Sequence, residues 1–170
     1  AIKKIFTIML PAVFGAGVYQ FNQIIDLIIA SYLEKDVPGA VASLEYANRL
    51  MQLPLGVFGI AISTAILPTL SLFLAEGKKA PYKKTLMQGY ALVAFITLPA
   101  MAGLIILAEP IIVLILQRGA FGDYSTSITV YPLVFYSLGI LSYSAIKITV
   151  AAFFSLKDSK TPVVIATFIL

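Results

Sequence analysis

One arginine stands near the start of an apolar stretch that is long enough to cross a membrane. It is Arg49, in the run Tyr46-Ala47-Asn48-Arg49-Leu50-Met51-Gln52. An ionised guanidinium in hydrocarbon costs about 3 kcal/mol on insertion scales, so membrane helices keep one where it meets water, a counter-ion or an anionic substrate. Its planar fork of five donors suits phosphate oxygens. We therefore expect Arg49 to bind an anionic substrate group in a water-filled cavity.

Polar and small residues surround Arg49 at helical spacing. The intervals between them are 4, 3, 4, 3 and 4, which predicts one helix face carrying Glu45, Arg49, Gln52, Gly56, Gly59 and Ser63. We expect Glu45, Arg49 and Gln52 to contact substrate, although a glutamate four residues before an arginine can also simply neutralise it. Small residues at this spacing are typical of helix packing, which we predict for the two glycines and the serine.

A carboxylate, Asp26, is the second candidate group. It lies about seven residues, or ~10 Å at 1.5 Å per residue, from the end of its predicted helix. At that depth it can bind a cation, carry a proton or pair with Arg49. A structural salt bridge or a protonated, hydrogen-bonded acid explains it equally well, and both alternatives stay open.

Other polar residues have simpler interpretations. Tyr136, Tyr143 and Lys147 follow one another at i, i+7 and i+11, and Lys147 is close enough to a helix end to snorkel to the headgroups. Glu109, directly before Pro110, predicts a helix break near an interface. Arg118 falls in a glycine-containing turn, where we expect it to meet lipid headgroups.

The composition explains what positions these residues. Of the 170 residues, 60% are hydrophobic and only 12% charged, with a mean hydropathy of +0.98, whereas soluble domains carry about 25% charged residues. A helix needs about 20 apolar residues to cross a bilayer. We therefore predict one transmembrane domain over 1–170, an all-α polytopic bundle of four complete spans and the start of a fifth: 5–33, 41–75, 85–117 (interrupted at Pro99 and at Glu109-Pro110), 127–155, and a helix opening at 161–162. Prolines within the spans predict bends.

The charged gaps between spans set the expected orientation. Lys and Arg number 2, 4 and 2 in alternate gaps, against 1 and 1 in the others. The positive-inside rule therefore places the N-terminal end, residues 78–84 and residues 157–160 in the cytoplasm. The net charge of +4 does not indicate nucleic acid, because the basic residues lie in these gaps and form no patch.

Several kinds of chemistry find no support in the sequence. Cysteine and histidine are both absent, so there is no disulfide, no thiolate metal site and no histidine base. No nucleophile has an adjacent base, no phosphate-binding loop is present and no acidic cluster has metal spacing. We predict no enzyme activity, no catalytic or metal site, and no cofactor other than a coupling cation. The chain opens without methionine, ends inside an apolar run and carries no signal-peptide pattern, so we expect a piece of a longer membrane protein.

Five segments, in order along the chain, resemble the MurJ (MviN) family of lipid II flippases. Together they are specific, although each alone is weak. They are Gln23-Ile24-Ile25-Asp26 with Ala30-Ser31, the run 46–62, Leu67-Pro68-Thr69-Leu70-Ser71, Gln117-Arg118-Gly119-Ala120-Phe121, and the run 154–163.

The resemblance implies a fourteen-helix exporter of two lobes around a central cavity, in the bacterial inner membrane. This chain would be the seventh to tenth helices and the start of the eleventh, most of the C-terminal lobe, and its partners would be the missing N-terminal lobe, membrane lipids and lipid II, the undecaprenyl-pyrophosphate-linked disaccharide pentapeptide. Alternating access would move lipid II outward for cell-wall synthesis. The resemblance gives Arg49 a role at the pyrophosphate and Asp26 a role at a coupling cation, Na⁺ or H⁺. Asn48 departs from the family, where many relatives have aspartate.

Two other functions stay open at this stage. A cation-coupled multidrug exporter of the same superfamily would keep kinked helices and a membrane carboxylate without needing Arg49. A structural membrane subunit would transport nothing, and in it Arg49 would serve only folding or assembly.

Overall fold

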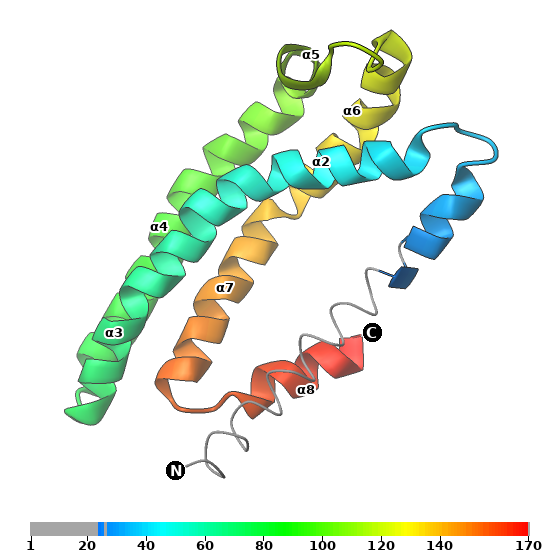
Figure 1. Ribbon diagram of the computed structural model, residues 1–170. Helices are drawn as coiled ribbons and strands as arrows, with labels where there is room; N and C mark the ends of the chain where they lie inside the picture. The colour runs from blue at the N-terminus through cyan, green and yellow to red at the C-terminus, as the bar shows by residue number, and fades with distance from the viewer. Residues whose placement is uncertain (1–23, 26, 170) are drawn as a thin grey trace.

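The computed structural model describes residues 24–25 and 27–169, and all regular structure in these residues is helical (Figure 1). The all-α prediction is therefore confirmed for this part of the chain. Residues 24–33 are helical apart from position 26, which is not described, and a turn at 34–39 follows. The remaining elements are α2 (Ala40–Pro54), η1 (Leu55–Ile60), α3 (Ala61–Ala75), α4 (Lys79–Ile106), α5 (Ala108–Leu116), α6 (Asp123–Leu138), α7 (Ile140–Ser155) and α8 (Lys160–Ile169).

The predicted span 41–75 is confirmed as one helical run of 36 residues, Ala40–Ala75. It is not uniform, because the six residues of η1 form a π-helix between two α-helical parts. Pro54 comes directly before η1. Proline has no N–H to donate to the carbonyl four residues back, so the α-helical hydrogen-bond pattern is weakened where the π-turn begins. Short π-helical turns within α-helices are often found at functional sites.

The predicted span 85–117 is wrong in detail. Helix α4 begins at Lys79 and passes through Pro99 without a break, and α5 is a separate helix after Leu107. In Figure 1, α5 is viewed nearly along its axis while α4 crosses the view. The break predicted at Glu109-Pro110 is confirmed just before these residues, which both lie in the first turn of α5. Proline suits that turn because its missing N–H has no helical partner there, and glutamate suits the positive end of the helix dipole.

The predicted span 127–155 is a bent pair. Helices α6 and α7 meet at Gly139 with an angle of 43°. Pro132, which predicted a bend, lies inside α6 instead. A β-carbon on Gly139 would come within 2.9 Å of Tyr143 Cε2, so glycine lets the Tyr143 ring lie over the bend.

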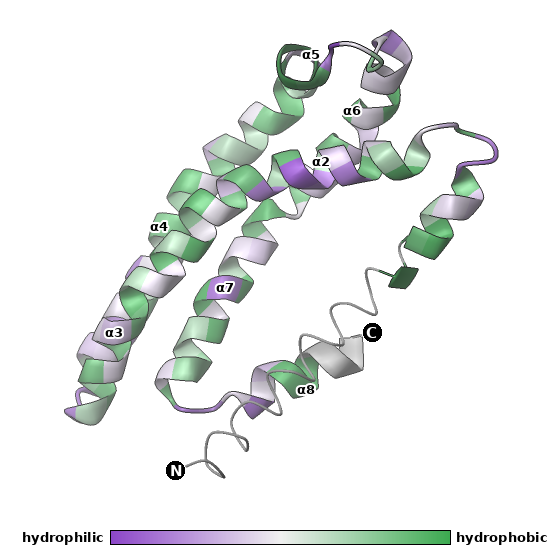
Figure 2. Cartoon of the chain, viewed as in Figure 1, coloured by the Kyte–Doolittle hydropathy of each residue, from purple (hydrophilic) through white to green (hydrophobic). Residues whose placement is uncertain are grey.

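Two helices among the described residues are long and apolar enough to cross a membrane, and a third is present if the bent pair is one span. Most of the first predicted span lies outside the described residues. Helix α8 starts the fifth at Lys160, one residue before the predicted position. Large apolar side chains such as Phe95, Ile106 and Leu114 are strongly exposed, and Figure 2 shows hydrophobic residues along much of α3, α4 and α7. This is the surface of a membrane protein; the count of four complete spans stays a prediction.

The helices pack in two groups. The first packing unit consists of α2, α5 and α6, and its core is formed by Ala47, Leu50, Ala108, Ile112 and Leu133. The second packing unit consists of α3, α4 and α7, where a β-carbon on Gly89 would come within 3.0 Å of Ile66 and 3.7 Å of Ile148. Hydrogen bonds join α4 to α7 in this unit: Tyr90 Oη and Thr149 Oγ1 are 2.8 Å apart, and Tyr82 Oη and Ser155 Oγ are 3.2 Å apart.

Candidate functional site

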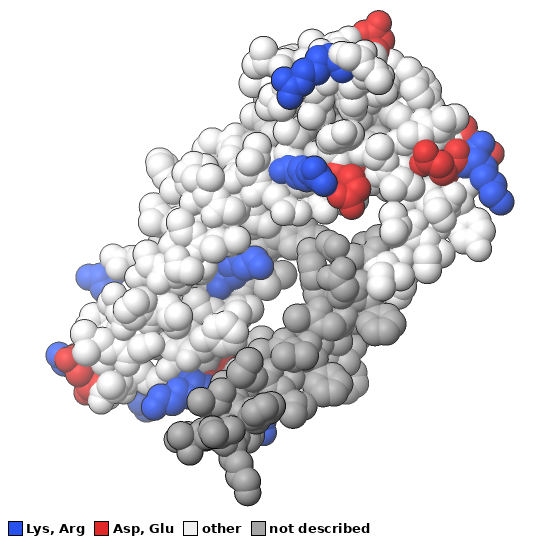
Figure 3. All heavy atoms as spheres, viewed as in Figure 1, with Lys and Arg blue, Asp and Glu red and all other residues white. Residues whose placement is uncertain are grey.

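Three of the four predicted site residues lie together on α2. Arg49 Nε stands 4.0 Å from Glu45 Oε2, at the outer limit of an ion pair, and the two side chains are 75% and 61% exposed. Figure 3 shows an acidic and a basic residue side by side on the face of the molecule that carries α2. An exposed ion pair one helical turn apart contributes only about 0.3–0.5 kcal/mol. Glu45 therefore does not hold the Arg49 guanidinium fixed. The donors of the guanidinium are free to bind another anion.

Gln52 extends the same surface through a second pair of side chains. Its Nε2 donates to Asn48 Oδ1 at 3.0 Å, four residues earlier. Glu45, Asn48, Arg49 and Gln52 thus form one polar surface over about two helical turns, which we call the α2 polar patch. It presents guanidinium and amide donors beside carboxylate and amide acceptors, a set that suits the phosphate oxygens and hydroxyls of a polar headgroup.

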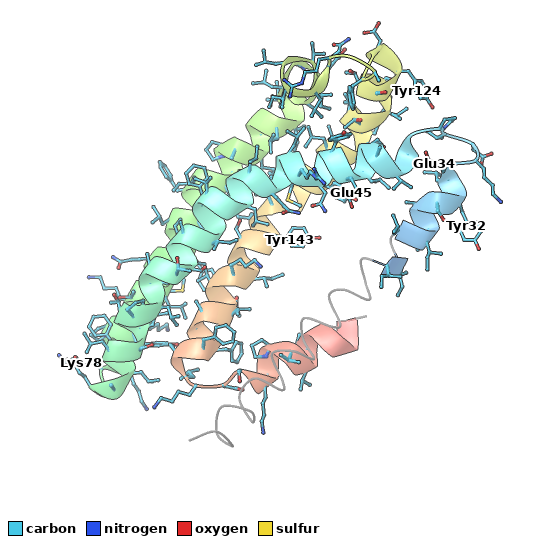
Figure 4. All side chains as sticks on the ribbon, in the orientation of Figure 1. Tyr32, Glu34, Glu45, Lys78, Tyr124 and Tyr143 are labelled. Carbon is cyan, nitrogen blue, oxygen red and sulfur yellow. The ribbon has the colours of Figure 1, made fainter. Side chains whose placement is uncertain are left out.

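The packing of α2 explains why this patch is exposed on the surface of the helix bundle. Its opposite side buries Ser43, Ala47, Leu50 and Met51, and α2 packs against α6. Burial of that apolar side leaves the polar residues on the other side. Figure 4 shows Glu45 at the lower edge of α2 in this view, on the same side as Tyr143 of α7.

The predicted single polar face is divided by η1. The residues up to Gln52 are exposed, whereas Gly59 and Ser63 are buried. At 3.6 residues per turn, one extra residue in a helix rotates everything after it by about 100°, and a π-turn has this effect. The packing role predicted for Gly59 is confirmed, because a β-carbon there would come within 3.1 Å of Ser144 Oγ. Gly56 has no heavy atom within 4 Å of such a β-carbon, so it does not pack closely.

The bend at Gly139 likewise separates Tyr136 from Tyr143 and Lys147, the polar residues predicted at i, i+7 and i+11 of one helix. Tyr136 packs on the core of the first packing unit, whereas Tyr143 and Lys147 are exposed on α7. The spacing predicted one row of side chains because it assumed a straight helix. Asp26, the candidate cation or proton site, lies outside the described residues.

Two segments that carry the family resemblance meet beside the patch. The ring of Tyr46, next to Glu45, contacts that of Phe121 edge-on, with centroids 5.5 Å apart and planes at 87°. Phe121 closes the predicted glycine-containing turn, in which its N–H donates to Arg118 O at 3.1 Å and Gly119 has φ +61°. The turn between α5 and α6 therefore supports the helix that carries the patch.

Two carboxylates that position helices were missed by the sequence reasoning. Glu34 Oε1 and Oε2 accept the N–H groups of Gly39 and Val41, both at 2.8 Å, at the start of α2. Asp158 Oδ1 accepts the N–H groups of Lys160 and Thr161, and its Oδ2 accepts the Thr161 hydroxyl, at the start of α8. An aspartate just before a helix that opens with Thr161-Pro162 is an N-cap signal that could have been found. Glu34 gives no such signal, because it lies six residues before α2.

Within the residues that the structure describes, no group of three acidic, cysteine or histidine side chains is placed to hold a metal ion. The groups that the α2 polar patch does present are hydrogen-bonding and charged side chains, centred on the exposed Arg49 guanidinium.

Comparison with known proteins agrees with the motifs. The family model described as "Lipid II flippase MurJ" matches residues 1–170. A protein of Vibrio cholerae named "Probable lipid II flippase MurJ" is 40% identical over 162 residues, covering 95% of this chain and 30% of that protein. Relatives with the same name from Rhizobium meliloti and Haemophilus influenzae are 38% and 37% identical, covering 97% and 95% of this chain and 30% and 32% of their own lengths.

The chain thus spans about a third of the length of these relatives. The match runs through every described helix, including α2 with its polar patch and the turn that supports it. This chain belongs to the lipid II flippase MurJ family.

Proposed function

We propose that this chain forms part of a flippase that moves lipid II across the bacterial inner membrane, and that the α2 polar patch contacts the substrate's pyrophosphate. The observation that carries the proposal is the state of Arg49, a charged side chain on an apolar spanning helix, 75% exposed and held only loosely by Glu45. Arginine binds phosphate through two parallel hydrogen bonds. A pyrophosphate offers the acceptors that this guanidinium lacks within α2.

The other patch residues have assigned roles in this proposal. Glu45 keeps the Arg49 side chain near its position without neutralising it fully. Gln52 and Asn48, which already bond each other at 3.0 Å, offer donors and acceptors to the sugar or peptide part of the headgroup. The family match favours this function over a multidrug exporter or a structural subunit, neither of which needs such a patch.

We further propose alternating access as the mechanism, with Lys78, Lys79, Lys83 and Lys84, at the start of α4, on the cytoplasmic side. The charge count of the gaps supports this orientation. The chain would be most of a C-terminal lobe, and an N-terminal lobe would complete the cavity. A coupling cation, Na⁺ or H⁺, bound at Asp26 belongs to the same proposal, as does a membrane potential acting on the transported charge at about 2.3 kcal/mol per charge per 100 mV.

The test compares Arg49→Ala, Arg49→Lys and Arg118→Ala in the full-length protein, with lipid II translocation measured in membranes. A hydrogen bond between charged groups contributes about 1.5–3 kcal/mol, so Arg49→Ala should lower translocation about 10- to 150-fold. Lysine keeps the charge but loses the planar fork of guanidinium donors. Translocation by Arg49→Lys should therefore lie between that of Arg49→Ala and that of the wild type.

The matched control is Arg118→Ala, because Arg118 is also exposed but lies in the turn after α5. It should retain translocation. Equal loss in both alanine variants, with normal protein levels, would mean that any exposed arginine matters and would remove the special role of Arg49. Full translocation in Arg49→Ala would contradict the proposed substrate contact.

A further inference from the structure

Two irregular points in neighbouring helices face each other in this fold. The first is η1, the π-helical turn within the run Ala40–Ala75. The second is the 43° bend at Gly139 between α6 and α7. The elements η1 and α7 pack together, and Gly59 meets Ser144, only five residues after Gly139. At 1.5 Å per residue, the contact at Ser144 and the bend at Gly139 are therefore about 7.5 Å apart along α7.

The contact between Gly59 and Ser144 is unusually close. A β-carbon on Gly59 would lie 3.1 Å from Ser144 Oγ, 3.2 Å from Leu55 Cδ1 and 3.4 Å from Ser144 Cβ. Such an approach brings one helix backbone directly against a side chain of the other. Gly56, in the same π-turn, has open space around it, so the close approach belongs to one position and not to the whole turn.

The hydroxyl at this contact is also unusual. Ser144 Oγ is the one buried side-chain polar atom without a hydrogen-bond partner among the residues that the structure describes. Other hydroxyls in these helices donate to the carbonyl three or four residues back, as Ser137 does to Leu133 at 2.6 Å. Buried polar groups nearly always have partners. An unpaired hydroxyl at a helix contact is consistent with a contact that differs between two arrangements of the helices.

The two irregular points separate the two packing units. Before them, α2 and α6 belong to the first packing unit with α5; after them, α3 and α7 belong to the second with α4. In Figure 1, α2, α5 and α6 lie in the upper half and α3 and α7 in the lower half, while α4 runs through both halves from α3 up to α5. The chain passes between the units at three places. One is the α4–α5 connection. The other two, from α2 to α3 and from α6 to α7, pass through an irregular turn.

We propose that η1 and Gly139 form a hinge, with Gly59 against Ser144 as its pivot, about which the two packing units rotate relative to each other. Hinges are a few residues that absorb backbone changes between packed bodies. Helix α4 is continuous and passes both units: besides α3 and α7 it contacts α2, α5 and α6, and Leu104 near its end packs on the core of the first packing unit. The rotation therefore moves the first packing unit over the end of α4 that carries Leu104. The α2 polar patch is on the first packing unit, so the rotation changes its position relative to α7. The hinge does not depend on which lipid is transported.

The experiment measures distances between spin labels in the full-length protein in lipid nanodiscs, without added substrate. One pair, on Leu114 of α5 and Leu72 of α3, reports across the units; the control pair, on Leu72 and Phe154 of α7, reports within the second unit. All three positions are exposed. We expect a broad or two-peaked distance distribution for the pair across the units, and a narrow distance distribution for the control pair within the second unit. Equally narrow distributions for both pairs would overturn the hinge.

Three variants test the pivot itself. Gly59→Ala places a methyl group against Ser144 and should shift the balance of the cross-unit distances. Gly56→Ala makes the same change in open space and should leave them as in wild type. Ser144→Ala in the Gly59→Ala background removes the nearest of the contacting atoms and should move the distance distribution back toward that of the wild type; Leu55 Cδ1, at 3.2 Å, stays as a close contact. Equal shifts in Gly59→Ala and Gly56→Ala would overturn the pivot, and if Gly59→Ala fails to fold, the wild-type comparison of the two pairs still decides. A protein with the hinge but without lipid II translocation would leave this inference standing while refuting the proposed function.

Discussion

The carboxylate of Glu34 holds the start of α2, because its Oε2 accepts the N–H of Val41 at 2.8 Å while its Oε1 accepts that of Gly39. Gly39 itself has φ +88° and makes no side-chain cap, so a residue from the preceding turn supplies the missing acceptor. Helix α2 carries the polar patch. The position of Arg49 therefore depends in part on a carboxylate fifteen residues earlier.

The first prediction concerns the pH dependence of this cap. Hydrogen bonds from Val41 and Gly39 hold the pKa of the Glu34 carboxyl below its usual range. The cap is therefore fully present above the ordinary glutamate pKa of about 4.3 and is lost as pH falls through the lowered pKa of the folded state. Hydrogen exchange at Gly39 and Val41, corrected for the intrinsic effect of pH, should accelerate on acidification only below that range.

Glu34→Gln should show the same faster exchange at neutral pH, because the amide accepts through one oxygen only. Asp36→Asn is the matched control, an acidic residue in the same turn. If exchange at Gly39 and Val41 is unchanged in Glu34→Gln, the cap does not hold α2.

The second prediction concerns the start of α8. The Thr161 hydroxyl and N–H hold the pKa of the Asp158 carboxyl below its usual range, with Lys160 adding to the effect. Asp158→Asn should therefore fray the first turn of α8, seen as faster exchange at Lys160 and Thr161. Thr161→Val keeps the amide and loses only the hydroxyl, so its effect should be smaller. An effect of Thr161→Val equal to that of Asp158→Asn would contradict the assigned backbone bonds.

The third prediction concerns packing in the second packing unit. Gly89→Ala places a methyl group within 3.0 Å of Ile66 Cδ1, and overpacking of this kind costs about 1–3 kcal/mol. Gly103→Ala, on the same helix but with open space, should be neutral or stabilising by up to about 1 kcal/mol, because alanine is the better helix former. Thermal unfolding in detergent measures the stability of both variants against the wild type.

Ile66→Val in the Gly89→Ala background removes the atom that is too close, so it should recover much of the lost stability. A Gly89→Ala protein as stable as Gly103→Ala would mean that Ile66 moves aside without cost.

The polar patch was predictable because α-helical spacing holds without interruption from Glu45 to Gln52. Beyond Gln52 the same spacing failed, since Pro54 and the π-turn rotate the following residues. Pro99 predicted a break and Pro132 a bend, but both lie within helices, whereas the bend between α6 and α7 is at Gly139. Neighbouring helices can satisfy the groups that a proline frees, so where a membrane helix bends depends on contacts such as Tyr143 on Gly139, which no local pattern reveals.

The central claim is that the headgroup of lipid II touches the α2 polar patch, and site-specific photocrosslinking tests it most directly. A photoreactive amino acid at Gln52 in the full-length protein should crosslink to radiolabelled lipid II, and excess unlabelled lipid II should suppress the product. The same group at Met87, exposed on α4, should give none. Crosslinking at Met87 but not at Gln52 would contradict the account.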